Sequence, residues 1–326
     1  MAPEHTCGFV DSEGHQCKER DMGTGFCFWH DKTIDKSGMD LSERLEDYAA
    51  AGGILQGLAL KRANLANVNL VRPGCATGYD MRNSDLYRAN LKGAHLFNLN
   101  LEGASLMKAN LIEANLHCTN LHNCNLLGVK LHGARLDNVK IGTHVQQEAI
   151  AVKSDKAREH DKAHDHFEQS EEIYRNLRKA AESDGLYTLA GHCARKELTM
   201  RRKQYPKLSK DRIVSKFVDL FCGYGESPVN VIGFSMALIF FCAILFFIFG
   251  IQGGDGMIQL STKNSLWQNL NDFFSAIYFS VVTFTTLGYG DIQPVGFSRF
   301  IATVEAFVGS FALALYVVVF VKKNNR

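Results

Sequence analysis

A leucine recurs at every fifth position through the middle of the chain, with an isoleucine in the last place. These apolar positions are 86, 91, 96, 101, 106, 111, 116, 121, 126, 131, 136 and 141. A period of five fits neither an α-helix, with 3.6 residues per turn, nor a strand, whose side chains alternate every two residues. Each five residues must therefore form one structural step, and many steps must stack to bury a continuous core.

The same rule extends backwards to four earlier leucines, Leu55, Leu60, Leu65 and Leu70. One extra residue around Pro73 shifts the phase before Met81, and a small or modest residue stands two positions before the leucines. With this pattern, residues 54–142 resemble the pentapeptide-repeat family. The resemblance implies a right-handed quadrilateral β-solenoid with four steps per coil, in which the leucine and the small residue point inward.

The charge of the repeats limits their partners. Residues 54–142 hold ten Lys or Arg and five Asp or Glu, a net charge of +5. Some pentapeptide-repeat proteins mimic DNA, which needs an acidic surface, so mimicry is excluded here. The net charge of the whole chain, +2, is too small to indicate a nucleic-acid partner. A rigid spacer or assembly surface is the simplest role, and sensing of an unknown cytoplasmic ligand or protein is the alternative.

Two apolar stretches lie in the last third of the chain. Residues 227–254 contain no charged side chain, and residues 300–321 contain only Glu305. Because about 20 apolar residues suffice to cross a bilayer, we expect two spans, at about 228–250 and 299–321. A buried helix of a large soluble core is the alternative for each.

Basic residues cluster just before the first span and just after the second: Lys207, Lys210, Arg212, Lys216, Lys322 and Lys323. Positively charged flanks remain on the cytoplasmic side. We therefore expect a multi-pass protein of a bacterial inner (plasma) membrane with both termini in the cytoplasm. That compartment is reducing, so the nine cysteines are expected to be thiols or metal ligands rather than disulfides.

An amphipathic segment at about residues 268–285 is too short for a third span and leads into the sequence TTLGYGD. In this setting, residues 226–326 resemble the pore domain of two-span potassium channels. The resemblance implies an all-α pore with a filter whose backbone carbonyl groups replace the water around K⁺. The filter residues would be Thr286, Leu287, Gly288, Tyr289 and Gly290.

The residue types in the filter suit this chemistry. Gly288 and Gly290 can adopt dihedral angles that other residues resist, so that successive carbonyl groups point the same way. Leu287 stands where the commonest filter has valine. Since Leu287 would contribute a carbonyl group, we expect altered packing and an unchanged number of oxygens. A channel that admits Na⁺ as well as K⁺ is the alternative.

Four residues are expected to support the filter: Thr285, Asp291, Tyr278 and Glu305. Asp291 would lie at the outer mouth, where an acid attracts cations, and Tyr278 could hydrogen-bond it from the pore helix. A carboxyl group is costly inside a membrane. We therefore expect Glu305 to face protein behind the filter.

The second span supplies candidates for a hinge and a gate: Gly309, Leu313, Val317 and Val321. Gly309 lies where similar pores have a hinge glycine, and close helix packing is the alternative. The other three would form an apolar gate that closes by dewetting. One chain supplies one filter strand and a ring needs four, so we expect a homotetramer in a lipid bilayer.

Cys7, Cys17, Cys27 and His30 have the spacing C-x9-C-x9-C-x2-H. Three thiolates and one imidazole would fill a tetrahedral Zn²⁺ shell and leave no open position, which predicts a structural metal. Residues 1–35 resemble small zinc knuckles with this ligand set. Free cysteines on a disordered tail are the alternative, and His15 is a rival to His30.

The remaining segments are predicted from their patterns. Residues 36–53 would be a linker or capping helix, residues 143–206 a two-helix hairpin, and residues 207–225 an amphipathic helix on the inner membrane surface. Three histidines, His160, His164 and His166, are either a sensor or simply solvated.

Together these patterns predict a multidomain membrane protein, a potassium-selective tetrameric channel whose gating the cytoplasmic repeats control. A membrane-anchored scaffold with a pore that never conducts is the alternative from another class. No catalytic or nucleotide-binding motif supports an enzyme.

Overall fold

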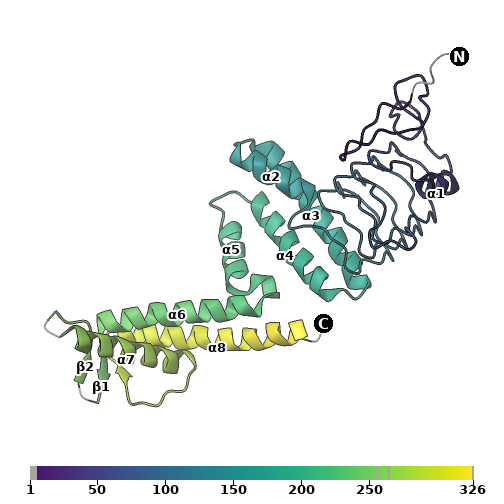
Figure 1. Ribbon diagram of the computed structural model, residues 1–326. Helices are drawn as coiled ribbons and strands as arrows, with labels where there is room; N and C mark the ends of the chain where they lie inside the picture. The colour runs from purple at the N-terminus through teal and green to yellow at the C-terminus, as the bar shows by residue number, and fades with distance from the viewer. Residues whose placement is uncertain (1–5, 255, 263–264, 325–326) are drawn as a thin grey trace. The chain divides into compact units, whose positions relative to one another are not determined.

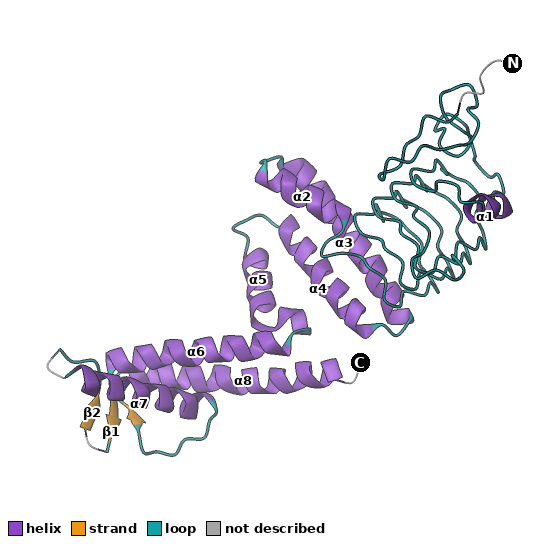
Figure 2. Cartoon of the chain, viewed as in Figure 1, coloured by secondary structure: helices purple, strands orange, loops and turns teal. Residues whose placement is uncertain are grey.

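The chain divides into two compact units, Met1–Arg212 and Ile213–Arg326, in a computed structural model that describes residues 6–254, 256–262 and 265–324 (Figure 1). Each unit has its own hydrophobic core. The first contains the repeats and a layer of helices, and the second is mostly helical (Figure 2).

Stacked coils of the repeats form most of the core of the first unit. Parallel bridges join residues 20 positions apart, from Asp80–Asn100 to Asn120–Lys140, so four steps of five residues complete one coil. Leu106 and Ala104 are fully buried, as are most leucines and small residues in the equivalent positions. The leucines and small residues of the repeat thus contribute to the core of the first unit.

The break in the repeat is longer than its phase indicates. Across residues 71–79 the bridges join partners 26 positions apart, as in Asn69–His95, instead of 20. The insertion is therefore six residues long. Five of them form one whole step, which leaves the phase of the repeat unchanged, and the sixth residue shifts the phase. Only that last residue was detectable from the spacing of the leucines.

Helix α1 (Ser42–Ala50) lies in the segment predicted to be a linker or capping helix. The Ser42 hydroxyl donates a hydrogen bond to the carbonyl oxygen of Ala66, and Glu46 accepts one from the Asn69 N–H at 2.7 Å. These contacts, with the fully buried Leu45, hold α1 on the first coil.

Three helices follow the repeats where the sequence predicts two: α2 (Gln146–Lys156), α3 (His160–Ser183) and α4 (Tyr187–Gln204). Helices α3 and α4 form the predicted hairpin, and α2 packs on α3. The Tyr174 hydroxyl donates to Glu148 on α2 at 2.5 Å. Helix α2 was missed because its charged sequence lacks a clear apolar stripe.

The second unit contains the end of α5 (Lys210–Cys222), a short 3₁₀ turn η1 (Gly223–Gly225), and the helices α6 (Pro228–Phe249), α7 (Leu266–Phe284) and α8 (Ser298–Asn324). Helices α6 and α8 are long and apolar enough to cross a membrane. A small antiparallel sheet in the order β2-β1-β3 lies beside them, formed by β1 (Ile251–Gly253), β2 (Gly256–Ile258) and β3 (Gln293–Pro294). Strands this short give no readable pattern in the sequence.

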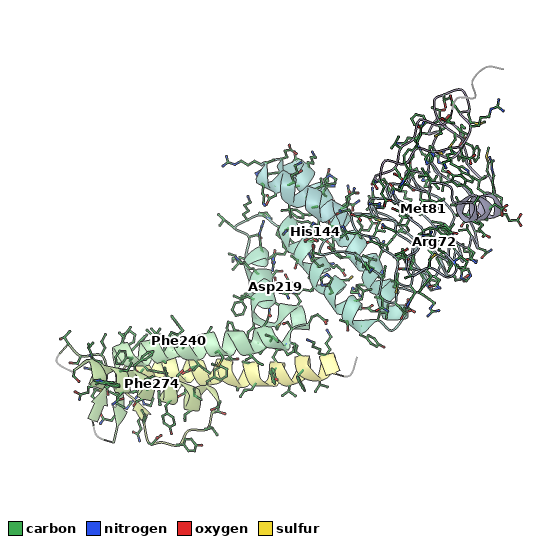
Figure 3. All side chains as sticks on the ribbon, in the orientation of Figure 1. Arg72, Met81, His144, Asp219, Phe240 and Phe274 are labelled. Atoms are coloured by element: carbon green, nitrogen blue, oxygen red, sulfur yellow. The ribbon has the colours of Figure 1, made fainter. Side chains whose placement is uncertain are left out.

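The pore-domain helices pack through aromatic side chains. Phe246 and Phe279 meet edge to face with ring centroids 4.8 Å apart. Outward-facing aromatics are also frequent: Phe240 on α6 and Phe274 on α7 (Figure 3) are 53% and 59% exposed. Apolar surface of this extent suits lipid or another protein surface rather than water.

Gly309 brings α8 close to the end of α7. A Cβ atom added at Gly309 would lie 2.2 Å from the carbonyl oxygen of Phe284, and α8 runs without interruption through this point. The close approach itself requires a glycine here, which supports the packing alternative without testing the hinge.

We expect Gly309→Ala to destabilise the pore domain by roughly 1–3 kcal/mol, because backbone atoms must move to admit the methyl group. Gly233→Ala on α6 is the matched control, since its Cβ would meet nothing within 4 Å and alanine favours helix. Thermal unfolding of the full chain measures both. Equal stability of the two variants would contradict the packing role.

Candidate functional site

The predicted filter begins where α7 ends. Thr285 caps the helix, and the φ angles of the following residues alternate: Thr286, Gly288 and Gly290 have φ of 57°, 58° and 80°. This alternation turns successive carbonyl groups in a way that ordinary extended backbone does not. The two glycines were expected to adopt unusual angles. That Thr286 shares this conformation was not predicted, because threonine rarely adopts it.

The residues of this segment are exposed in the single chain. Among the described residues, none donates a hydrogen bond to the carbonyl oxygens of Thr286–Tyr289. Backbone oxygens are almost always paired with a donor or with water. A run of four unpaired oxygens can therefore accept a cation that has lost its hydration shell.

The residues after the filter are held by the pore helix. The Tyr278 hydroxyl donates a hydrogen bond to Asp291 Oδ2 at 2.9 Å. At the end of α7, the Thr285 hydroxyl donates to the carbonyl oxygen of Val281 at 2.7 Å. These two bonds bracket the filter segment and limit its movement relative to α7.

Glu305 lies in the interior of the pore domain, 1% exposed. Its Oε1 accepts a hydrogen bond from the hydroxyl of Ser280 on α7. The same hydroxyl lies 2.8 Å from the carbonyl oxygen of Ile239 on α6. Glu305 therefore packs against protein, and this cluster joins all three long helices.

The predicted gate residues occupy one exposed face of α8. Leu313, Val317 and Val321 follow each other at four-residue intervals and are each more than two-fifths exposed. Gly309 lies one turn before them, at its contact with α7.

The four predicted zinc ligands converge in the interior of the first unit. Their ligand atoms all lie within 4.8 Å of one another. His30 Nδ1 is 3.2 Å from Cys27 Sγ and 3.7 Å from Cys7 Sγ, and the sulfurs of Cys17 and Cys27 are 3.9 Å apart. In a tetrahedral zinc site, bonds of about 2.3 Å to sulfur place neighbouring ligand atoms about 3.8 Å apart. The spacing of this cluster fits that shell.

The support around His30 also suits a metal ligand. His30 Nε2 lies 3.0 Å from the carbonyl oxygen of Gln56 and can donate to it, which leaves Nδ1 free to bind the metal. Phe9 stacks on the ring with centroids 4.0 Å apart. The rival His15 is exposed and pairs instead with Asp11, so it lies outside the cluster.

The electrostatics of the cluster favour a bound cation. Burial raises the pKa of the Cys27 thiol to about 12 and lowers the pKa of His30. A divalent cation would reverse this penalty by stabilising thiolates. Three thiolates and one Zn²⁺ carry a net charge of −1. The buried Lys36, whose charge acts on Cys27, can balance it.

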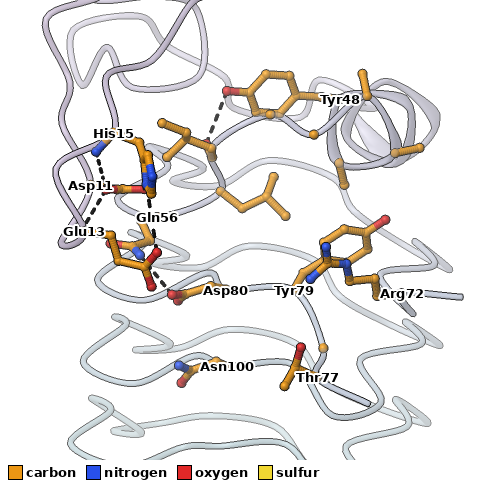
Figure 4. Close-up of a pocket in the computed structure, with 18 of the residues that line it drawn as sticks. Asp11, Glu13, His15, Tyr48, Gln56, Arg72, Thr77, Tyr79, Asp80 and Asn100 are labelled. Atoms are coloured by element: carbon orange, nitrogen blue, oxygen red, sulfur yellow. Dashed lines mark hydrogen bonds and ion pairs between the residues drawn. The ribbon is translucent and has the colours of Figure 1, made fainter. Parts of the chain in front are cut away.

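A broad cavity of about 1130 Å³ adjoins this cluster within the first unit (Figure 4). Gln56 links its two sides: it accepts from the Ser12 N–H at 3.1 Å and donates to Asp80 at 2.9 Å. The inserted segment 71–79 supplies Arg72, Thr77 and Tyr79 to the opposite wall (Figure 4).

Comparison with known families agrees with these two regions. Residues 233–325 match the ion channel family, and residues 77–111 and 104–141 match pentapeptide repeats, with eight copies. The chain thus carries an ion-channel domain and a pentapeptide-repeat segment. Neither family is enzymatic, which points to a non-enzyme. No curated protein matched the chain.

Several solved pentapeptide-repeat structures are similar over part of the chain. Rfr23 from the cyanobacterium Cyanothece 51142 is 33% identical over 26% of this chain, with a TM-score of 0.15. HetL from Nostoc sp. strain PCC 7120, a protein involved in heterocyst differentiation regulation, is 30% identical over 25%, with a TM-score of 0.14. The matches span 47% and 50% of those two proteins, about half their length.

For the metal cluster we expect about one Zn²⁺ per chain in the purified protein, lost in Cys27→Ala because three ligands cannot hold the metal tightly. Cys75→Ala is the control, since Cys75 is exposed and lies outside the cluster. Metal analysis by mass spectrometry measures both. Unchanged zinc in Cys27→Ala would exclude this ligand set.

Proposed function

We propose that the protein is a homotetrameric, potassium-selective channel whose cytoplasmic repeats control its gating. The run of unpaired carbonyl oxygens at Thr286–Tyr289 carries this proposal. It follows a pore helix and lies between two apolar helices of membrane-spanning length. A run of backbone oxygens suits a monovalent cation that sheds its water, as K⁺ does more readily than smaller cations.

The tetramer follows from the need to surround the ion. One chain supplies one strand of oxygens, and four copies around an axis close the ring. The exposed filter side chains Leu287 and Tyr289, 59% and 66% exposed in the single chain, would then pack against neighbouring copies. Helix α7 would point its partially negative C-terminal end at the central cavity and favour a cation there.

The basic residues that flank α6 and α8 favour an inner (plasma) membrane of a bacterium with both termini in the cytoplasm. The coils with bridges every 20 residues favour a right-handed quadrilateral β-solenoid. The cluster of Cys7, Cys17, Cys27 and His30 would hold a structural Zn²⁺, which would supply folding energy to a segment with little apolar core of its own. No nucleic acid is expected as a partner.

Two features connect α5 with the proposed gate. The turn η1 has three successive left-handed residues, Gly223, Tyr224 and Gly225, with φ of 56°, 57° and 80°. Directly after it, Glu226 forms an ion pair with Lys322 near the end of α8. A movement of α5 would therefore be transmitted to α8 through Glu226, the first residue after the turn, and its ion pair with Lys322.

Selectivity is tested by flux into liposomes under separate K⁺ and Na⁺ gradients. We expect K⁺ flux to exceed Na⁺ flux by at least tenfold, and Leu287→Val to retain that preference, because both residues offer the same carbonyl oxygen. Tyr278→Phe, which loses the bond to Asp291, should lower the preference by loosening the filter.

Equal K⁺ and Na⁺ permeability of the wild type would favour the non-selective cation channel. No K⁺ flux under any tested condition would favour the membrane-anchored scaffold. Repeating the assay on a chain without residues 1–206 tests control by the cytoplasmic part, because unchanged gating would remove it from the proposal.

The ion pair between Glu226 and Lys322 is expected to hold α8 in the unbent form seen here, which we assign to the closed gate. Glu226→Gln should raise the open fraction roughly two- to fivefold, the effect of losing a partly exposed ion pair. The exchanged pair Glu226→Lys with Lys322→Glu should restore it. Single-channel recording measures the open fraction.

Lys323→Gln is the matched control, because Lys323 is exposed and has no ion pair among the residues described. If the exchanged pair has the same open fraction as Glu226→Gln, the effect does not come from attraction between the two charges. That result would contradict the proposed coupling between the ion pair and the gate.

A further inference from the structure

A second, smaller cavity of about 320 Å³ lies in the helical layer of the first unit. Its walls come from the end of α2, the first turns of α3, the end of α4 and the segment that leads into α5. Four segments far apart in the sequence thus converge on it. Neither the repeats nor the predicted metal ligands line it.

Cations outnumber acids around this cavity. Lys203, Lys207 and Arg212 line it, against one carboxylate, Asp155. Asp155 is distant from its possible partners: its Oδ1 is 3.9 Å from Lys207 Nζ and 3.9 Å from His160 Nδ1. Within this lining, three cations thus face a single carboxylate. His160 and His164 add further charge when protonated.

Lys203 is the most constrained of these cations. It is partly buried, with its ammonium group 5.0 Å from the centroid of the Phe167 ring, and burial lowers its pKa. No carboxylate among the described residues forms an ion pair with it. A cation held out of water in this way gains from an anion placed beside it.

Arg212 is fixed toward the cavity by the backbone. Its Nη1 donates to the carbonyl oxygen of Tyr205 at 2.9 Å, which orients the guanidinium and leaves other N–H groups available. Arginine binds phosphate through two parallel hydrogen bonds, and lysine adds a point charge. The two side chains lie at opposite ends of one short connection, residues 203–212.

We propose that this cavity is a binding site for a phosphate group, carried either by an anionic membrane lipid or by a small soluble phosphorylated molecule. A volume of about 320 Å³ matches the lower end of small-molecule sites. A metal ion is disfavoured, because the lining offers one carboxylate among several cations. The nearby group of His164, Asp165 and Glu168 is fully exposed, and its two acids do not line the cavity.

Chain connectivity favours the lipid as the source. Arg212 is the third residue of α5, and the next residues on that helix include exposed apolar side chains, Ile213, Val214 and Phe217. A helix with this face lies in the boundary between headgroups and acyl chains. The lipid source rests on the proposed membrane position of α5. The phosphate site itself does not, and it holds whether or not the pore conducts.

The test measures binding to the purified full-length protein rather than flux. In one arm, inorganic phosphate is titrated against chloride at constant ionic strength. In the other, phosphatidylglycerol is titrated against phosphatidylcholine in neutral detergent micelles. Calorimetry or native mass spectrometry reports the affinity in each arm.

Two substitutions remove charge from the cavity with little change in packing: Lys203→Met, which keeps the apolar stem over Phe167, and Arg212→Gln. Each should weaken binding about tenfold, the effect of losing a charge-assisted hydrogen bond. Lys207→Gln, on an exposed connection, is a third variant that should fold even if the others do not. Lys210→Met is the control. This substitution removes one positive charge close to the cavity, but Lys210 does not line the cavity.

One result supports the site with lipid as its source. In it, the protein binds phosphatidylglycerol, Lys203→Met and Arg212→Gln weaken this binding, and Lys210→Met changes it by no more than about twofold. Binding of inorganic phosphate alone with the same pattern supports the site with a soluble source. Absence of binding in both arms, or equal loss in Lys210→Met and the cavity variants, overturns the proposal. None of these binding results depends on channel activity. Failure of the phosphate site can therefore be distinguished from failure of the proposed channel function.

Discussion

The rest of the pore domain depends on the backbone carbonyl oxygens of Thr286–Tyr289, to which no described residue donates a hydrogen bond. For these oxygens to stay free of donors, a frame must keep them from turning toward other groups. The frame consists of α7 before the segment and the bond from Tyr278 to Asp291 after it. The alternating left-handed residues are the local consequence of this arrangement.

The frame in turn depends on how tightly three helices meet. Ser280 on α7 contacts Glu305 on α8 and the backbone of α6. Gly309 brings α8 against the last residue of α7, where any side chain would collide. The end of α7 is therefore fixed from two directions, and the filter begins at that end. This one requirement explains why a mostly apolar span contains a carboxyl residue, Glu305, and a glycine, Gly309.

The sequence predicts the parts of this molecule that repeat or that follow chemical rules. The five-residue period identified the inward leucines, and the spacing of three cysteines and one histidine identified a cluster that closes in space. The spacing of the leucines could not reveal a whole inserted step between Leu70 and Met81, because a complete step preserves the phase. Helix α2 and the strands β1–β3 were missed for a different reason, since tertiary contacts rather than periodic side chains define them.

Position in space also decides the roles of residues that look alike in the sequence. His15 and His30 are both near the cysteines in the chain, yet only His30 presents Nδ1 to the sulfurs, because Gln56 accepts from its other nitrogen. Gln56 belongs to the first repeats, and it also bonds Ser12 and Asp80. The cluster of three cysteines and His30 is thus linked to the repeats through one residue, whose backbone carbonyl group bonds His30 and whose side chain bonds Ser12 and Asp80. Gln56 also lines the broad cavity, so this one residue joins His30, the cavity and the first repeats within the first unit.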